Sequence, residues 1–255
     1  MWNREAGDWA RFQEDQTRDL IEQTLTALDV GAGTTVLDVG CGAGLGLALA
    51  QERGAVVSGV DASPALLELA AARLADGAEV KVGDLQKLPF QDDTFDVVMS
   101  YNAIRYATDA AAAIREFARV TVPGGQVGIG SWGEPRRCET TAFLFAVVAL
   151  FPALPHGAHQ GSANTPDEVR AAMTAVGLTP SITGEVDCPF VYEDFGTAWR
   201  ALGSTELVQQ AIALRGEETV REVFDAHLRP AVRADGTVRQ ENVFAYSVAR
   251  VSPAP

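Results

Sequence analysis

The sequence contains few cysteines and few histidines, which excludes two common ways of stabilising a fold. Its 255 residues include three cysteines and three histidines. Cys41, Cys138 and Cys188 stand far apart without a CxxC pair. Neither a disulfide framework nor a zinc site is therefore predicted, and we expect no metal.

Positive charge is also scarce. The chain has 20 Lys plus Arg against 34 Asp plus Glu, a formal net charge of −14, and Arg136 and Arg137 form its one basic cluster. Binding to nucleic acid needs a local excess of Lys and Arg that displaces phosphate counterions, so we expect no nucleic-acid partner. With 47% hydrophobic residues the chain can bury a sizeable core, and one large domain with a cap fits its length.

Long apolar runs are absent. The longest, 142–151, has ten residues, whereas a helix that crosses a bilayer needs about 20. We interpret this run as a buried helix or the wall of a pocket and expect no membrane partner. Residues 1–16 carry acids and lack the apolar core of a secretory signal, so a cytoplasmic protein is expected.

What the chain does contain is a regular alternation of short apolar runs and amphipathic stretches. This pattern predicts an α/β fold in which helices cover both faces of a mostly parallel sheet. The expected strands are 35–40, 55–61, 78–84, 95–101, 126–132, 178–188 and 241–251. The expected helices are 20–28, 45–53, 64–74, 110–122 and 166–176, with Ser63, Asp109 and Thr165 as N-caps of the last three.

The rhythm of the pattern also divides the chain. Residues 1–32 are predicted to form an N-terminal helical cap, and 33–135 the main ligand-binding core. The apolar run and a loop rich in Pro, Gly and His make 136–164 a lid insertion. Residues 165–255 complete the core and contain a helical insertion at about 189–240.

Three glycines alternate where the first core strand meets the first core helix. Gly40, Gly42 and Gly44 form a GxGxG pattern within TVLDVGCGAG, residues 35–44. Glycines at such a turn allow a ligand to approach the backbone, and the following helix offers amide donors. A dinucleotide fingerprint would be GxGxxG, but Leu45 stands at its last position, which disfavours NAD and a nicotinamide oxidoreductase.

Ligand-type residues follow the next three strands at the same expected edge of the sheet. Asp61 ends the second strand, where a carboxylate accepts both hydroxyls of a ribose. After the third strand, Asp84 is suited to accept from the exocyclic amine of a base, and Leu85 to pack on its ring. Ser100, Tyr101 and Asn102 end the fourth. Each feature alone fits a turn, a helix cap or a solvated acid, but together they indicate one ligand crevice.

These motifs, over about 36–132, resemble class I S-adenosylmethionine-dependent methyltransferases, in particular the small-molecule group that resembles the ubiquinone and menaquinone biosynthesis enzymes. The resemblance implies a Rossmann-like seven-stranded sheet whose last strand is antiparallel, with S-adenosylmethionine as cofactor. It places the ribose on Asp61 and the adenine on Asp84, with Asp38 positioning the glycine loop. The expected cofactor residues are Asp38, Gly40, Cys41, Gly42, Gly44, Asp61, Ala62, Gly83, Asp84, Leu85, Ser100, Asn102 and, from the N-terminal segment, Trp9.

Catalytic residues are less well marked. Family members often carry histidine after the fourth strand, where this chain has Ile104-Arg105-Tyr106-Ala107, and the Asn/Asp-Pro-Pro-aromatic tetrad of amino-methylating enzymes is missing. Holding the acceptor in line with a sulfonium methyl supplies roughly 7–11 kcal/mol of the barrier, so a dedicated base is not required. If one is used, the candidates are His156 and His159 in the lid, then Tyr101, Arg105 and Tyr106.

The expected function is methyl transfer to an O, N or C atom of a small, hydrophobic metabolite of secondary metabolism, by a monomer or homodimer. We expect the apolar run, with Phe195 and Trp199, to form the wall of the acceptor pocket. Two alternatives remain open because fold does not dictate reaction: a cyclase or pericyclase that keeps the cofactor site, and a non-catalytic module that binds S-adenosylmethionine.

Overall fold

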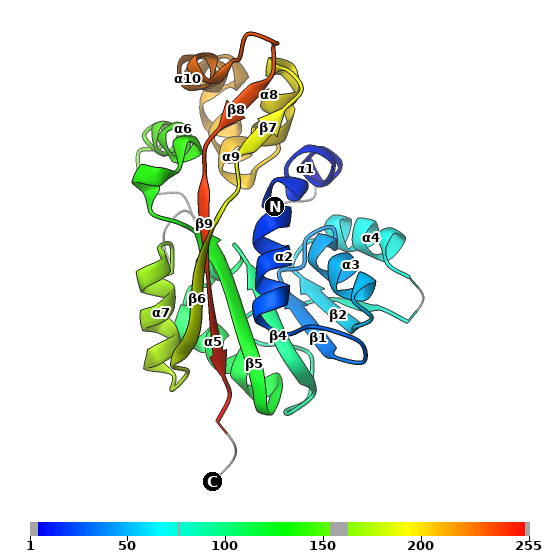
Figure 1. The fold of residues 1–255 in the computed structure, drawn as a ribbon. Helices are drawn as coiled ribbons and strands as arrows, with labels where there is room; N and C mark the ends of the chain where they lie inside the picture. The colour runs from blue at the N-terminus through cyan, green and yellow to red at the C-terminus, as the bar shows by residue number, and fades with distance from the viewer. Residues whose placement is uncertain (1–4, 76, 154–162, 253–255) are drawn as a thin grey trace.

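The computed structural model describes residues 5–75, 77–153 and 163–252. Its centre is a seven-stranded sheet in the order β3-β2-β1-β4-β5-β9-β6 (Figure 1). The first five strands pair in parallel, and β9 is antiparallel to both β5 and β6. This confirms the Rossmann-like sheet with an antiparallel last strand. The strands are β1 (Thr35–Val39), β2 (Val56–Asp61), β3 (Glu79–Val82), β4 (Phe95–Tyr101), β5 (Thr121–Trp132), β6 (Pro180–Asp187) and β9 (Val243–Arg250).

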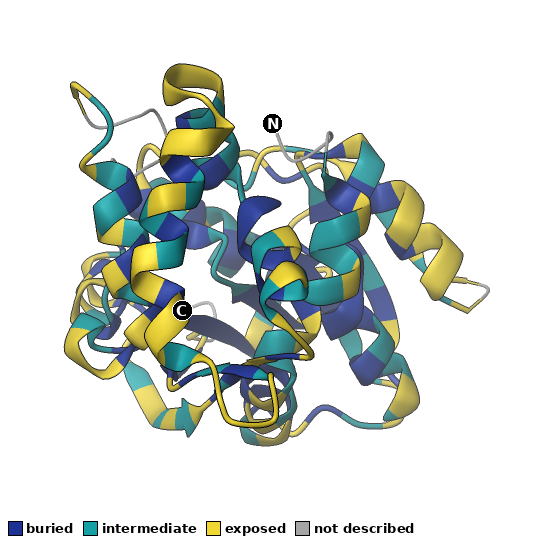
Figure 2. Cartoon of the chain, turned by 90° about the horizontal axis from the view of Figure 1, so that it is seen from above, coloured by how far each residue is buried: buried dark blue, intermediate teal, exposed yellow. Residues whose placement is uncertain are grey.

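Helices cover both faces of the sheet. On one face lie α2 (Arg18–Ala27), α3 (Leu45–Glu52) and α4 (Pro64–Arg73), and on the other α5 (Ala110–Val120) and α7 (Pro166–Ala175). Each face has its own apolar cluster, with Leu25 and Leu47 buried in the first and Phe117 and Met173 in the second. Seen from above, the helices turn their buried sides toward the sheet and their exposed sides outward (Figure 2). The predicted layering follows from this two-sided burial.

The three predicted helix caps are confirmed. The Ser63 hydroxyl accepts the Leu66 N–H at 3.3 Å, and the Asp109 carboxylate accepts the Ala112 N–H at 2.9 Å. Thr165 forms a capping box with Glu168. Such side chains satisfy amides that the first helical turn leaves unpaired, which fixes where each helix begins.

The boundary between α5 and β5 differs from the prediction. The helix ends at Val120 rather than at 122, and β5 starts at Thr121 rather than at 126. Thr121 pairs with Phe95, and its hydroxyl donates to the Phe117 carbonyl oxygen at 2.7 Å. The register then shifts, so residues 122–125 bulge out of the ladder instead of separating helix from strand.

A smaller unit lies over the carboxyl edge of the sheet (Figure 1). We call this unit the cap; it does not include the N-terminal segment. Buried residues from its several elements, among them Phe143, Tyr192 and Phe224, share one cluster, so segments 136–153 and 189–240 pack together. The insertion is not wholly helical, because β7 and β8 form a two-stranded antiparallel sheet. The cap elements are η3 (Pro135–Arg137), α6 (Glu139–Val148), β7 (Phe190–Tyr192), α8 (Phe195–Gly203), α9 (Glu206–Arg215), α10 (Glu217–Leu228), η4 (Arg229–Ala231) and β8 (Val238–Gln240).

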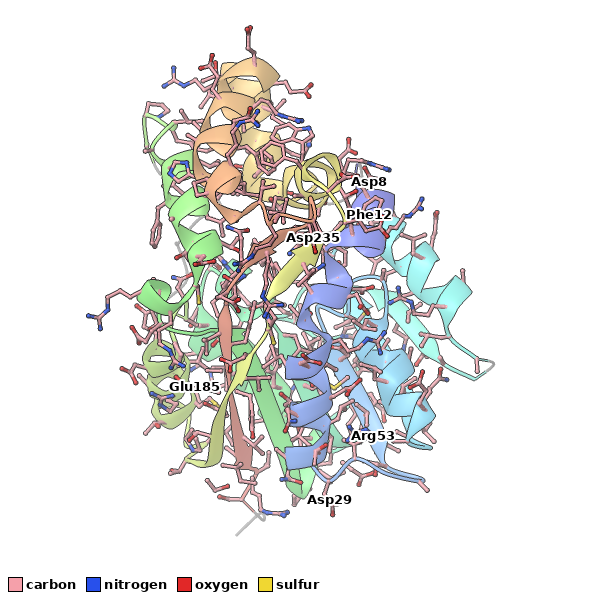
Figure 3. All side chains as sticks on the ribbon, turned by 45° about the horizontal axis from the view of Figure 1, so that its top comes forward. Asp8, Phe12, Asp29, Arg53, Glu185 and Asp235 are labelled. Carbon is pink, nitrogen blue, oxygen red and sulfur yellow. The ribbon has the colours of Figure 1, made fainter. Side chains whose placement is uncertain are left out.

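The N-terminal segment joins the cap to the core. It consists of α1 (Ala6–Phe12) and the short 3-10 helix η1 (Glu14–Thr17). Asp8 accepts two hydrogen bonds from Arg200 of α8, at 2.5 and 2.9 Å, and Arg200 also lies over the Phe12 ring; Figure 3 labels Asp8 and Phe12 at this junction. Within the described ranges, no helix has the length and apolarity that a membrane span needs.

Candidate active site

A cavity of about 270 Å³ lies between the carboxyl edge of the sheet and the cap. Its core side is built from the β1–α3 loop and the end of β2, with Leu85 after β3. Its cap side is built from aromatic and aliphatic residues, and the N-terminal segment contributes Trp9 and Glu14. The topology explains this position, because ligands of open α/β sheets bind outside the carboxyl ends of the strands.

The glycine loop forms part of the cavity floor. Gly40 and Gly42 have positive φ values of 80° and 56°, which favour glycine. A Cβ on Gly40 would lie 2.2 Å from the Ala103 Cβ, and one on Gly42 would lie 2.8 Å from the Trp9 ring. Side chains at these positions would therefore collide with Ala103 and Trp9, so glycine allows these two walls to approach the loop, while Gly40 and Gly42 themselves line the cavity.

Asp61 supports this loop directly. Its Oδ2 accepts the Gly42 N–H at 3.0 Å, and its Oδ1 accepts the Ser63 N–H at 2.8 Å. Burial raises the pKa of Asp61, and the two amide donors oppose that rise. Each carboxylate oxygen has two lone pairs, so Asp61 keeps acceptor capacity for a hydroxyl pair in the cavity.

Asp38 is the most deeply buried acid of the cavity lining. It is only 2% exposed, and its Oδ1 has no hydrogen-bond partner in the described part of the chain. Burial raises its pKa well above the usual range, and the Asp61 and Glu14 carboxylates raise it further. Three acids around one loop give this end of the cavity a negative potential that a cationic ligand would relieve.

Glu14 reaches the loop from the N-terminal segment, and the sequence analysis missed it. Its Oε2 pairs with Arg73 at 2.6 Å, and its Oε1 accepts the Leu45 N–H at 3.3 Å, at the start of α3. Burial raises the pKa of Glu14, although the Arg73 guanidinium lowers it in part. The sequence holds no signal for these contacts, because both partners lie far along the chain.

The opposite end of the cavity is apolar. Trp132 stacks near Phe244 with ring centroids 4.5 Å apart and meets Phe190 edge-on at 5.6 Å. Leu144 of α6 and Leu207 of α9 complete this wall. The apolar run thus supplies Leu144 to the pocket as expected, while its Phe143 and Val147 are buried in the cap.

Most of the predicted site residues meet at this cavity. The lining contains Trp9, Asp38, Gly40, Cys41, Gly42, Asp61, Ala62, Leu85, Tyr101, Asn102, Arg105 and Tyr106. The Asn102 Oδ1 is buried without a partner in the described residues. Burial raises the pKa of Cys41 well above its usual range, so this side chain is a thiol and not a thiolate.

Four predicted cofactor residues lie outside the lining. The fully buried Ser100 hydroxyl donates to the Val39 carbonyl oxygen at 2.8 Å, which ties β4 to β1. Asp84 is exposed, and its Oδ1 accepts the Gln86 N–H at 2.8 Å within its own turn. Gly44 and Gly83 are packing positions, where a Cβ would meet Ala70 and Val60.

The catalytic candidates also divide into residues that could reach a substrate in the cavity and residues that could not. The Tyr101 ring lines the cavity, but its hydroxyl lies 3.5 Å from the Met99 sulfur, and burial raises its pKa well above the usual range. Its hydroxyl therefore donates to Met99 and stays protonated, so it is not available as a base. Arg105 and Tyr106, in the short 3-10 helix η2 (Ile104–Tyr106), do line the cavity. His156 and His159 lie outside the described residues.

The expectation that Phe195 and Trp199 would complete the pocket wall is wrong. Both rings pack on Phe224 of α10, with centroids 5.0 and 5.1 Å away, inside the cap. Trp132, Phe190, Leu207 and Phe244 take their place at the cavity. Sequence alone could not separate these two sets of residues, because both are apolar and only the fold of the cap decides which faces inward.

Comparison with known proteins agrees with this geometry. Residues 37–129 match the family model described as a methyltransferase domain. The chain is 36% identical over 179 residues to a demethylmenaquinone methyltransferase of Mycolicibacterium paratuberculosis, which covers 66% of this chain and 74% of that one. It is 37% identical over 135 residues to an uncharacterized protein of Mycobacterium tuberculosis, of which the chain spans about half, 48%.

Solved structures share the fold at low sequence identity. The methyltransferase in complex with the Haloferax volcanii Trm112 methyltransferase activator has a TM-score of 0.64 at 22% identity, covering 98% of this chain and 97% of that one. The [4+2]-cyclase SpnF has a TM-score of 0.59 at 20% identity, covering 92% and 80%. The geranyl diphosphate C-methyltransferase of Streptomyces coelicolor, solved with S-adenosyl-L-homocysteine, has a TM-score of 0.53 at 20% identity, covering 91% and 79%.

The residues present fit S-adenosylmethionine. The backbone of Gly40 and Gly42 lines the cavity, and Asp61 offers acceptors at the end of β2. Asp38 and Asn102, whose Oδ1 atoms are buried without a partner in the described residues, line the same cavity and suit a ligand that carries an ammonium and a sulfonium. Together with the matching family model and relatives, this site shows that the chain belongs to the class I S-adenosylmethionine-dependent methyltransferases.

Proposed function

We propose that the protein transfers the methyl group of S-adenosylmethionine to an O, N or C atom of a small, apolar acceptor. The observation that carries this proposal is the division of one cavity into an acidic end at the glycine loop and an aromatic end under the cap. When bound, the cofactor supplies an electrophilic methyl group on a sulfonium. The protein's own part is to bind, orient and shield.

The acidic end would hold the cofactor. Asp61 accepts from the ribose hydroxyls while keeping its two bonds to the loop amides. Leu85 packs on the adenine, and the backbone of Gly40 and Gly42 borders the methionine end. Asp38, which lacks any partner for Oδ1, accepts from the cationic end of the ligand.

Positioning and exclusion of water would account for catalysis. Among the described lining residues the aromatic end carries no histidine and no acid, so no side chain there serves as a strong base. Alignment of two reactants supplies roughly 7–11 kcal/mol of a barrier. The cap and the N-terminal segment close over the cavity and strengthen electrostatic interactions inside it by keeping water out.

The relatives support a small acceptor with apolar character. One named relative is a demethylmenaquinone methyltransferase, and one structural neighbour was solved with geranyl diphosphate. Because the chain spans only about half of other relatives, their whole activity is not transferred to it. The aromatic wall of Trp132, Phe190 and Phe244 provides the independent argument for an apolar acceptor.

The first experiment is calorimetric titration with S-adenosylmethionine and S-adenosylhomocysteine, with NAD as control. We expect binding of the first two and none of NAD. Incubation with methyl-labelled cofactor and acceptor candidates then follows product mass. A gain of one methyl supports the proposal, an unchanged mass with a rearranged product favours a cyclase, and cofactor binding without any turnover favours a binding module.

A further inference from the structure

We propose that the acceptor carries an oxyanion, a carboxylate or phosphate type group on an apolar skeleton, and that Arg105 binds this group. This inference rests on the proposed function, because it assigns the chemistry of the acceptor at the same cavity. It makes Arg105 a specificity-determining residue rather than a base.

The first argument is the distribution of charge around the cavity. The described lining contains three acids, Glu14, Asp38 and Asp61, all of which surround the glycine loop. Arg105 is the single cation among these lining residues. It lies on η2, directly after the strand end that provides Tyr101 and Asn102, and shares the cavity lining with the aromatic wall.

The second argument is that Arg105 has no counter-ion. Its Nε is buried and lacks any hydrogen-bond partner in the described chain, and no carboxylate of those residues forms an ion pair with it. The guanidinium lies 5.7 Å from the centre of the Tyr106 ring, a contact that leaves the Nε–H unsatisfied. Arg73 and Arg119, which are also partly buried, are by contrast paired with carboxylates at 2.6 and 2.7 Å.

An unpaired, partly buried guanidinium is costly unless a ligand satisfies it. Its planar fork of donors matches carboxylate and phosphate oxygens. The cofactor's own carboxylate is the competing partner, and the affinity of the Arg105 variant for S-adenosylhomocysteine separates the two assignments. The acceptor that Arg105 lacks is therefore supplied by an anionic group on a molecule whose apolar skeleton contacts Trp132 and Phe244.

The test uses two fluorescent dyes that differ by one anionic group, 8-anilinonaphthalene-1-sulfonate and N-phenyl-1-naphthylamine. Both are titrated into protein saturated with S-adenosylhomocysteine, so that only the acceptor end is open. Arg105→Gln is expected to weaken binding of the sulfonate dye roughly 10–100-fold and to change the affinity for the neutral dye by less than about twofold. Arg115→Gln removes an equal charge at a side chain that is 59% exposed on α5, and should change neither dye.

Competition experiments then identify the kind of anion and show whether the proposal holds. Displacement of the sulfonate dye by 2-naphthoate or by 2-naphthyl phosphate supports the proposal and tells carboxylate from phosphate, whereas displacement by neither contradicts it. The proposal is overturned if Arg105→Gln lowers the affinity for both dyes equally or changes neither affinity. It is also overturned if neither dye binds the protein saturated with S-adenosylhomocysteine. A large loss of S-adenosylhomocysteine affinity in that variant would assign Arg105 to the cofactor instead. Failure of the unaltered protein to bind S-adenosylhomocysteine is a separate result that refutes the proposed function.

Discussion

Asp38 gives the most specific prediction. Its buried carboxylate should lower the stability of the ligand-free protein and strengthen binding of the cofactor. The carboxylate is 2% exposed and its Oδ1 has no partner in the described residues. Leaving a buried polar group unsatisfied costs roughly 1–3 kcal/mol, and more when the group is charged. Asp38→Asn keeps the shape and removes the charge, so we expect the ligand-free variant to be more stable than the original protein.

The pH dependence has a definite sign. Burial, with the Asp61 and Glu14 charges, raises the folded-state pKa of Asp38. Stability from such a group is fully present below the unfolded pKa of about 3.9 and is lost as the pH rises through the folded value. Since asparagine does not titrate, the stability difference between variant and original should widen as the pH rises from the unfolded pKa toward the folded value and stay constant above it.

The assay is thermal unfolding at several pH values, with and without S-adenosylmethionine. A gain of about 1–3 kcal/mol corresponds to roughly 2–12 °C in Tm for a domain of this size. The variant should also bind the cofactor roughly 10–100-fold more weakly, because it loses a charged acceptor, and the ligand-induced rise in Tm should shrink accordingly.

Asp93→Asn is the matched control for this prediction. Asp93 is exposed and has a φ of 52°, which asparagine adopts readily, so its stability should change by less than about 0.5 kcal/mol. If Asp38→Asn has the same or a lower Tm at pH 8 and binds S-adenosylmethionine normally, the assignment of Asp38 as a strained cofactor acceptor is refuted.

Three further substitutions test other parts of the site and the cap. Asp61→Ala removes the acceptor from the end of β2 and should weaken S-adenosylmethionine binding by roughly 1.5–3 kcal/mol in calorimetry. Gly40→Val places side-chain atoms against the Ala103 Cβ and adds strain at positive φ, so cofactor binding should be lost while circular dichroism still reports the sheet. Phe224→Ala empties the centre of the cap and should lower the unfolding free energy by about 3–5 kcal/mol in a denaturant titration.

Each of these has its own contradicting result. Unchanged cofactor affinity in a folded Asp61→Ala protein would move the ribose elsewhere. A Gly40→Val protein that binds normally would show that the loop can retreat from Ala103. A loss below about 1 kcal/mol for Phe224→Ala would mean that the cap collapses around the gap or unfolds independently of the sheet.

The sequence predicted the sheet well because its signals are local. Alternating apolar runs and capping residues such as Ser63 and Asp109 depend only on residues a few positions away in the sequence. The structure shows both helix caps as expected. The glycine loop and Asp61 were found for the same reason. The bulge at 122–125 was missed because Pro-Gly-Gly is typical of a turn, and only pairing with β4 keeps it in a strand.

The aromatic half of the cavity could not be predicted in this way. Phe190 and Phe244 line the cavity, whereas the Phe195 ring packs on Phe224 inside the cap. Their roles depend on how β7 and β8 pair and how α6 packs on α9 and α10. Ser100 and Asp84 illustrate the reverse case, since residues of ligand type at strand ends instead satisfy backbone groups of the fold.

The N-terminal segment has a consequence for the order of events at the site. Gln13 and Gln16 bind Tyr192 and the Val191 backbone in the cap, while Glu14 binds Arg73 on the core side. Because Trp9 lies directly on the glycine loop, we expect a molecule held there to leave faster when these bonds are open. Where this opening is slower than methyl transfer, residues 5–17 would set the residence time of the spent cofactor.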